Sequence, residues 1–275
     1  MDAFDVVIIG AGPAGLTAAT YLARFRRRVL LLGAGPPRAS WIPESHNTPG
    51  FPHGVSGPAI LGRLTEQAAQ YGVAYRELRV EALSKAGEVF EAVAGTHRFQ
   101  APAVLLATGV EDVRPPIAGL DEAVRRSLVR MCPICDAYEA IGRRIAVLGE
   151  GPLAQREAAF LRTYSDDIAV LDAASGQIVF GETEVEWTPH DGASRRFDCL
   201  YLALGCRPQS ALALACGAER DDNGDLLVDS RQMTSVAGLY AAGDVVRGLN
   251  QIAVATGEAA IAATAVHNRL REAAR

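Results

Sequence analysis

Two stretches of the chain share one order of apolar and polar positions. Residues 4–33 read FDVVIIGAGPAGLTAATYLARFRRRVLLLG, and residues 143–172 read RRIAVLGEGPLAQREAAFLRTYSDDIAVLD. Each begins with a short β-branched run, continues through a Gly-x-Gly-Pro turn into a segment rich in Ala and Leu, and ends in a second apolar run. This order predicts strand, helix and parallel strand. The fold class is therefore α/β, with two Rossmann-like βαβ units.

The first turn has the glycines that a bound dinucleotide requires. Gly10 permits a tight turn out of the strand, Gly12 lets the backbone approach a pyrophosphate, and Gly15 lets the helix pack closely on the strand. The start of the helix then offers free N–H groups and a partial positive charge to the phosphates. A bare G-x-G-x-x-G also occurs in purely structural turns, but its position between a predicted strand and helix favours a nucleotide site.

The second turn keeps the weaker pattern G-x-G-x-x-A at Gly149, Gly151 and Ala154, with the negative charge of Glu150 inside it. Asp172 occupies the position that often binds a ribose 2′-hydroxyl. An acid there suits NADH better than NADPH, if a nicotinamide cofactor binds. The alternative is that Asp172 only caps the strand in a loop.

Two later strands also end in loops where a cofactor could sit. LLATG ends at Thr108 and Gly109, and YAAGDVV contains Gly243 and Asp244. The Ala-rich segment that follows predicts one long helix beginning near Asn250 or Gln251, whose N-terminus could stabilise a developing negative charge.

Composition narrows the class of protein. A chain of 275 residues favours two domains, and a net charge of −5 argues against nucleic acid as a partner. Five cysteines are an odd number in a chain too large to need disulfide staples, which favours a reducing compartment. The N-terminal apolar run is far shorter than the roughly 20 residues of a membrane span. We expect a soluble, cytoplasmic protein.

The segment MCPICD, residues 131–136, places Cys132 and Cys135 three positions apart and Asp136 directly after them. A C-x-x-C pair at a helix start lowers the pKa of its first thiol, and the thiolate is the nucleophile. A structural zinc site would need four ligands, and the other cysteines form no second C-x-x-C. Zinc binding and two inert core cysteines are thus the weaker alternatives to a redox pair, and no metal site is predicted.

Motifs along nearly the whole chain resemble the low-molecular-weight bacterial thioredoxin reductases, within the FAD-dependent pyridine nucleotide–disulfide oxidoreductases. They occur in the same order as in that family: GAGPAG (10–15), HNTPGFPHGVSGP (46–58), LLATG (105–109), CPICD (132–136), GEGPLA (149–154), LALGCRPQ (202–209) and AAGDVVRGLNQIAVATGEAA (241–260).

The resemblance implies a split architecture. Residues 1–112 and 210–275 would form an FAD-binding domain, and residues 113–209 an inserted NAD(P)H-type domain that carries the cysteine pair. The connectors would be EDVRPP and GCRPQS, each containing a proline suited to a stiff link.

The resemblance also implies roles for single residues. Cys135 would exchange electrons with the flavin, Cys132 would attack the substrate disulfide, and Asp136 would move protons between thiols and solvent. Asn47 and Thr48 would lie near the isoalloxazine, and Val80 near the adenine. The remaining FAD contacts would be Gly10, Gly12, Pro13, Ala14 and Gly15 at the pyrophosphate, Asp244 at the ribityl chain, and Gln251 and Ile252 at the flavin edge.

The chain departs from the family in its second nucleotide unit. Thioredoxin reductases carry a basic HRR-x-x-x-R run after the second strand of this unit, whereas this chain has LDAASGQ. Only residues 172–196 separate Leu171 from the strand FDCLYLALG, too few for a further βαβ element. The inserted domain is therefore expected to be truncated and to lack the usual NADPH grip.

These features predict an enzyme that passes electrons between FAD and Cys132–Cys135 and reduces a thioredoxin-like protein or a small disulfide. Oxidation of a dithiol substrate by oxygen, and reduction from another donor such as ferredoxin, would use the same residues. A non-enzymatic redox sensor is the alternative from a different class. The resemblance further implies a homodimer.

Overall fold

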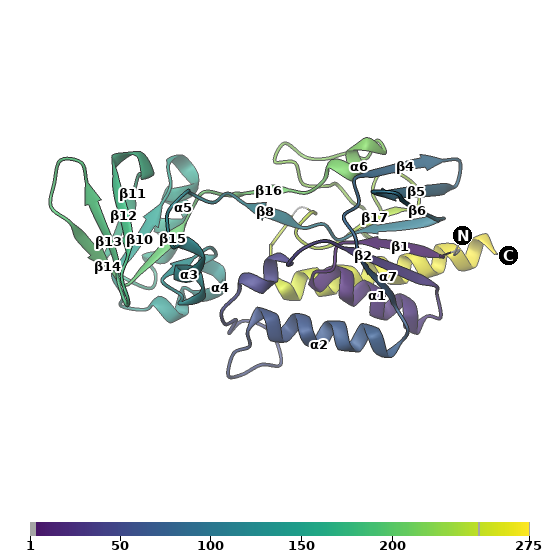
Figure 1. Ribbon diagram of the computed structural model, residues 1–275, viewed down its shortest axis with the longest axis horizontal. Helices are drawn as coiled ribbons and strands as arrows, with labels where there is room; N and C mark the ends of the chain where they lie inside the picture. Colours follow the sequence, from purple (N-terminus) through teal and green to yellow (C-terminus); the bar gives the residue numbers. More distant parts are fainter. Residues whose placement is uncertain (1–3, 247, 275) are drawn as a thin grey trace. The chain divides into compact units, whose positions relative to one another are not determined.

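The computed structural model describes residues 4–246 and 248–274 and divides into two compact units (Figure 1). Unit 1 contains the described residues up to Ser40, Pro58–Glu111 and those from Arg207 onward. Unit 2 contains Trp41–Gly57 and Asp112–Cys206. The segment Trp41–Gly57, which the sequence places in the FAD domain, therefore belongs to the compact unit that carries the cysteine pair.

A five-stranded parallel sheet forms the centre of unit 1. Its order is β17-β7-β1-β2-β3, and each neighbouring pair runs parallel. The strands are β1 (Val6–Ile9), β2 (Val29–Gly33), β3 (Ala74–Glu77), β7 (Ala103–Leu106) and β17 (Leu239–Ala241). The strand predicted within LLATG thus ends at Leu106, which leaves Thr108 and Gly109 in the following loop, as expected.

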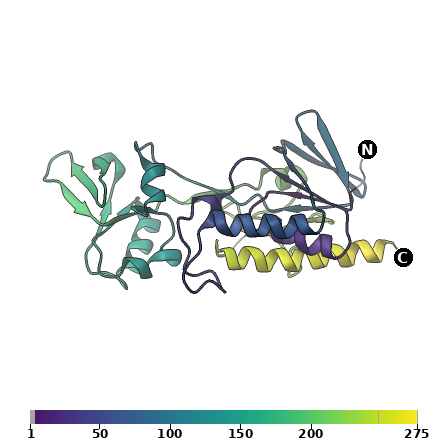
Figure 2. The same cartoon turned by 60° about the horizontal axis from the view of Figure 1, so that its bottom comes forward.

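Both faces of this sheet are covered, which explains why β1 is apolar at every position. Val6 and Ile8 face one core cluster, and Val7 and Ile9 face the other, because successive side chains of a strand point to opposite faces. The first face packs on α1 (Pro13–Arg24), α2 (Gly57–Gln70) and α7 (Ile252–Ala273), which lie together in Figures 1 and 2. The second packs on an antiparallel sheet of β4 (Ala82–Ala86), β5 (Val89–Ala94) and β6 (His97–Ala101) and on α6 (Ala211–Ala215).

Unit 2 contains the second parallel sheet, of order β11-β10-β15-β9. Its strands are β9 (Val129–Arg130), β10 (Ile145–Leu148), β11 (Ile168–Leu171) and β15 (Cys199–Leu202). One face packs on α3 (Leu120–Arg125) and on the apolar side chains of an antiparallel sheet; the other packs on η2 (Tyr138–Ala140) and α5 (Gly151–Leu161). The short helix α4 (Pro133–Asp136) precedes η2 and contacts α5.

The segment between β11 and β15 is fully described and contains no α-helix. It forms the short turn η3 (Ala173–Ser175) and the strands β12 (Gly176–Phe180), β13 (Val185–Pro189) and β14 (Arg195–Phe197), which pair as an antiparallel sheet. The absence of a further βαβ element in this stretch confirms that part of the sequence prediction.

The chain crosses between the units along two extended segments. β8 (Val110–Asp112) and β16 (Cys206–Pro208) pair as a two-stranded sheet, at the connectors that the prolines indicated. The remaining element is the 3₁₀ turn η1 (Arg38–Trp41). Among the residues described, no helix is long and apolar enough to cross a membrane.

Candidate functional site

The first glycine turn has the shape of a dinucleotide cradle. Gly10 has a φ of 112°, and a Cβ on it would lie 2.0 Å from the carbonyl oxygen of Ala107. A Cβ on Gly15 would lie 1.8 Å from the carbonyl oxygen of Gly10. Both positions therefore exclude a side chain because of the protein's own backbone. Gly12 differs, because a Cβ there would meet Pro37 Cβ at 3.9 Å, an ordinary contact.

Gly12 directly precedes α1, where Pro13 occupies the first helical turn and Ala14 is buried. The first N–H groups of a helix have no partner within that helix. The backbone therefore presents donors beside Gly12, which has no side chain to cover them, as phosphate binding requires. These residues fit the pyrophosphate of FAD.

Loops from the ends of three parallel strands and the start of α7 meet around this turn. A Cβ on Gly243, after β17, would touch Ala14 Cβ at 3.0 Å and Ala255 Cβ at 3.5 Å. The N–H of Gly243 donates to Glu258 Oε2 at 2.8 Å, which ties the loop to α7. The structure thus brings Gly243 next to the glycine turn.

Asp244 has a partner that the sequence analysis missed. Arg38 Nη1 donates to Asp244 Oδ2 at 3.3 Å, and both side chains are largely covered. No periodicity or motif singles out Arg38, which lies in a 3₁₀ turn far from Asp244 in sequence.

Unit 1 also contains five further residues predicted to contact FAD, whereas Asn47 and Thr48 belong to unit 2. Thr108 Oγ1 donates to the Gln209 carbonyl at 2.7 Å, and Gly109 adopts a φ of 65°. Val80 is partly buried in the core cluster between the two sheets. Gln251 is the N-cap of α7 and Ile252 its first residue, which confirms the predicted helix start.

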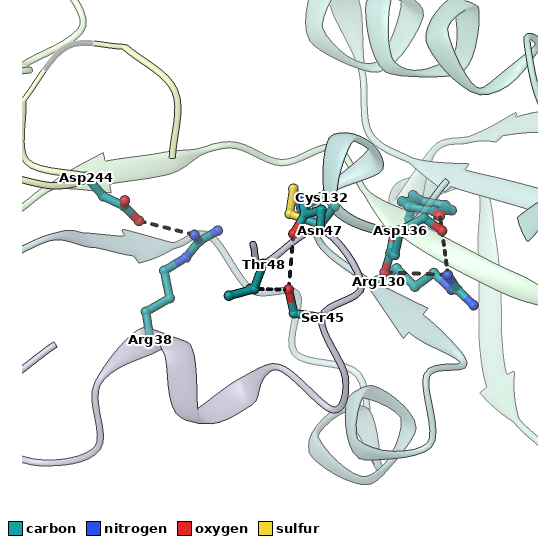
Figure 3. The surroundings of a disulfide bond; sticks show 10 residues. Arg38, Ser45, Asn47, Thr48, Arg130, Cys132, Asp136 and Asp244 are labelled. Atoms are coloured by element: carbon teal, nitrogen blue, oxygen red, sulfur yellow. Dashed lines mark hydrogen bonds and ion pairs between the residues drawn. A yellow bond between two sulfur atoms is a disulfide. The ribbon is translucent and has the colours of Figure 1, made fainter. Parts of the chain in front are cut away.

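Cys132 and Cys135 form a disulfide with their Cα atoms 5.3 Å apart. Cys132 is the N-cap of α4 and Pro133 its first residue, so the proline replaces an N–H that needs no helical partner. The helix is a single turn of four residues. Figure 3 draws the disulfide with Ser45, Asn47 and Thr48 of the same unit, where the Ser45 hydroxyl lies 3.0 Å from Asn47 Oδ1 and 2.8 Å from Thr48 Oγ1.

Asp136 is held by two residues that sequence reasoning also missed. Tyr201 Oη donates to Asp136 Oδ1 at 2.9 Å, and Arg130 Nη1 lies 3.5 Å from Asp136 Oδ2 (Figure 3). Burial raises the pKa of Asp136 to about 6, against the opposing effects of Arg130 and Tyr201. Arg130 could have been noticed in the sequence, because it is a charged residue among the apolar residues of LVRMC.

The second glycine turn has the backbone of a dinucleotide site and two acidic side chains beside it. Gly149 has a φ of 158° with its Cβ position 2.4 Å from the Ala203 carbonyl, while a Cβ on Gly151 would have no heavy atom of the described residues within 4 Å. Ala154 is fully buried. Asp172 Oδ1 accepts from the Ala174 N–H at 2.7 Å, and its carboxyl group faces Glu150.

The meeting of two carboxyl groups raises the pKa of Glu150, mainly through its hydrogen bond to Asp172 and their repulsion. Asp172 is the N-cap of η3, and its carboxyl group lies close to a second acid.

A parallel-sheet nucleotide fold with a C-x-x-C disulfide in a second such unit defines a disulfide oxidoreductase with a nucleotide cofactor. The family model described as "Pyridine nucleotide-disulphide oxidoreductase" matches residues 4–188 and 176–259, and the chain therefore belongs to this family. It is a thioredoxin reductase-like, FAD-dependent disulfide oxidoreductase.

Similar proteins match over nearly the whole chain. A thioredoxin reductase of Treponema pallidum is 30% identical over 95% of this chain and 95% of its own. One from Listeria monocytogenes is 28% identical over 94% of this chain and 91% of its own. The crystal structure of thioredoxin reductase from Streptococcus pyogenes has a TM-score of 0.90 at 24% identity, covering 98% of this chain and 99% of the other.

Proposed function

We propose that the protein reduces the disulfide of a thioredoxin-like protein or a small molecule through Cys132 and Cys135. The observation that carries this proposal is the disulfide itself, at the start of a one-turn helix whose last residue is Asp136. Two apolar side chains are exposed in this segment: Ile134, between the two cysteines, is 54% exposed, and Tyr138, three positions after Cys135, is 74% exposed. They would face the apolar surface around a substrate disulfide.

FAD, when bound, supplies two electrons to the protein disulfide, whose reduction also takes up two protons. We propose that its pyrophosphate lies at Gly10, Gly12, Pro13, Ala14 and Gly15, with Thr108, Gly109, Gly243 and Asp244 around the rest of the cofactor. Asn47 and Thr48 near the isoalloxazine, Val80 near the adenine, and Gln251 and Ile252 at the flavin edge complete the proposed contacts. The free backbone at Gly12, where a Cβ would make an ordinary contact with Pro37 Cβ at 3.9 Å, supports the pyrophosphate position.

The chain's own cysteines carry out the exchange. The Cys132 thiolate attacks one sulfur of the substrate disulfide, whose S–S bond breaks as a mixed disulfide forms. Cys135 then attacks Cys132 Sγ, which restores the protein disulfide and releases the second substrate thiol. The carboxylate of Asp136 accepts the proton from the attacking thiol and returns it to the departing thiolate, and its pKa of about 6 suits both roles near neutral pH.

The proposed electron donor to the flavin is a nicotinamide cofactor. Glu150 and Asp172 oppose a 2′-phosphate, so NADH is favoured over NADPH as the nicotinamide donor, at Gly149, Gly151 and Ala154. A homodimer in the cytoplasm stays a prediction from the family.

The test is steady-state turnover of the flavin-loaded protein with oxidised thioredoxin or cystine, using NADH and NADPH in parallel. We expect turnover that is lost in Cys132→Ser and Cys135→Ser. Cys206→Ser, an exposed cysteine outside the disulfide, is the matched control and should retain activity.

Turnover that survives Cys135→Ser would overturn the proposal. If the flavin is reduced only by a dithiol and is reoxidised by air, the direction of electron flow is reversed and the enzyme is a dithiol oxidase.

A further inference from the structure

The surroundings of Asp136 contain a charged and a polar residue that no step above uses. Arg130 lies on β9 and Tyr201 on β15, and these two residues are register partners in the parallel pair. Side chains at paired positions of adjacent strands lie on the same face of a sheet. The Arg130 guanidinium consequently lies beside the Tyr201 ring, with Cζ 6.0 Å from its centroid.

The segment that leads from α4 into η2 packs on this face of the sheet. Tyr201 is fully buried and belongs to the core cluster that includes Ala137 and Ala140, the residues just after Asp136. The side chain of Arg130 is only 11% exposed. Two strands therefore fix both residues, whereas Asp136 ends a helix of a single turn.

Arg130 and Tyr201 together bind three oxygen atoms of Asp136. Tyr201 Oη donates to Oδ1 at 2.9 Å and also to the backbone carbonyl at 3.2 Å. Arg130 Nη1 donates to the same carbonyl at 2.8 Å and lies 3.5 Å from Oδ2. The backbone contacts fix the end of α4, and the side-chain contacts fix the carboxylate.

Among the described residues, Cys199 and Glu139 are two further titratable groups that interact with this carboxylate. Cys199 precedes Tyr201 by two positions on the same face, and burial raises the pKa of its thiol to about 11, so it stays neutral. Glu139 on η2 is acidic and opposes ionisation of Asp136. Arg130 therefore supplies the positive charge that balances the Asp136 carboxylate in this partly buried place.

We propose that Arg130 and Tyr201 are positioning residues that hold Asp136 ionised and oriented at the redox disulfide, and so set the pH at which its proton transfer operates. The proposal rests on the proposed function insofar as it assigns the proton transfer to Asp136. Removing the positive charge or the donated hydrogen bond would stabilise the protonated acid, because both groups favour the carboxylate.

The experiment compares the pH profiles of kcat/KM for the flavin-loaded wild type, Arg130→Met, Arg130→Lys and Tyr201→Phe. Ionised Asp136 is the proton acceptor, so activity should rise through its pKa. In Arg130→Met this acid limb should move up by about 1 to 2 pH units, the usual effect of losing one nearby charge. Tyr201→Phe should move it up by about half a unit, the size of one hydrogen bond. Arg130→Lys should stay closer to the wild type than Arg130→Met.

Arg126→Met is the matched control, since Arg126 lies in the same unit and donates to backbone carbonyls away from Asp136. Its acid limb should coincide with that of the wild type. An unchanged limb in both Arg130→Met and Tyr201→Phe would overturn the proposal.

A second measurement separates this inference from the enzymatic one and does not depend on turnover. The Asp136 carboxyl carbon, labelled with ¹³C, is titrated by NMR in the oxidised full chain. The pH at the midpoint of this titration should be higher in Tyr201→Phe than in the wild type. This substitution removes the hydroxyl group and keeps the buried ring. Equal midpoints in wild type and Tyr201→Phe would overturn the positioning role, whereas absence of turnover in the wild type with shifted midpoints would refute only the proposed function.

Discussion

Gly10 and Gly12 stand two positions apart in one turn, yet the structure predicts opposite results when each is changed to alanine. At Gly10 the methyl group would lie 2.0 Å from a backbone carbonyl oxygen, and the φ of 112° is unfavourable for any side chain. At Gly12 the methyl would make an ordinary contact with Pro37 Cβ at 3.9 Å, and the φ of −80° suits alanine. Gly10 is thus needed for the fold, and Gly12 for what the fold binds.

The expected magnitudes follow from these two environments. Gly10→Ala combines overpacking, which costs about 1–3 kcal/mol, with left-handed strain of about 1–2 kcal/mol, enough to threaten folding. In Gly12→Ala a weaker N-cap is offset by the lower entropy of the unfolded chain, so the free energy of unfolding of the apoprotein should change by less than about 1 kcal/mol. Its methyl group would hold the pyrophosphate away from the helix N–H groups, and FAD affinity should fall at least about tenfold.

The assay has two parts. Denaturant unfolding of the flavin-free proteins measures stability, and titration with FAD, followed by flavin fluorescence, measures affinity. Gly62→Ala is a suitable control because a Cβ there would meet no heavy atom of the described residues within 4 Å and the residue lies inside α2. If Gly12→Ala bound FAD as tightly as the wild type, the assignment of this turn to the pyrophosphate would be wrong.

Further predictions concern stability, substrate binding and the donor. Burial raises the pKa of Glu157 to about 7, and its Oε2 has no hydrogen-bond partner among the described residues. The pKa of Glu157 is higher in the folded than in the unfolded protein, so the folded protein loses stability as pH rises toward 7. In chemical unfolding, Glu157→Gln should therefore raise the free energy of unfolding by about 1 kcal/mol at pH 8, a value discounted for partial exposure, and leave it unchanged at pH 4. Tyr138→Ala should raise KM for thioredoxin about fivefold with kcat and thermal stability unchanged; an unchanged KM would exclude this side chain from docking. NADH should reduce the flavin faster than NADPH in anaerobic stopped flow, and Glu150→Gly should increase the rate with NADH. A preference for NADPH would contradict the charge argument.

The sequence predicted the two βαβ units well because their order of strand, turn and helix is local. Continuous apolar runs such as Val6–Ile9 indicate strands covered on both faces, and the structure shows cores on each side. The start of the long helix at Ile252 and the missing βαβ element after β11 were also readable, since both depend on short stretches of chain.

The residues that the sequence did not reveal are those joined by long-range pairing. Arg38 reaches Asp244 across more than two hundred positions, and Tyr201 meets Asp136 because β15 pairs with β9. Tyr201 reads as one more apolar residue of its strand until the register is known. The segment Trp41–Gly57 was assigned to the FAD domain by resemblance, whereas its packing groups it with the unit that carries the cysteine pair.

Electron exchange between the flavin and Cys132–Cys135 is tested most directly by anaerobic addition of dithiothreitol to the FAD-loaded protein. The flavin absorbance should bleach in the wild type, because the thiols of the reagent reach the flavin through the protein disulfide. It should persist in Cys132→Ser and Cys135→Ser, with FAD still bound. Equal bleaching in the wild type and both variants would show that the cysteine pair does not carry the electrons, and would contradict the account.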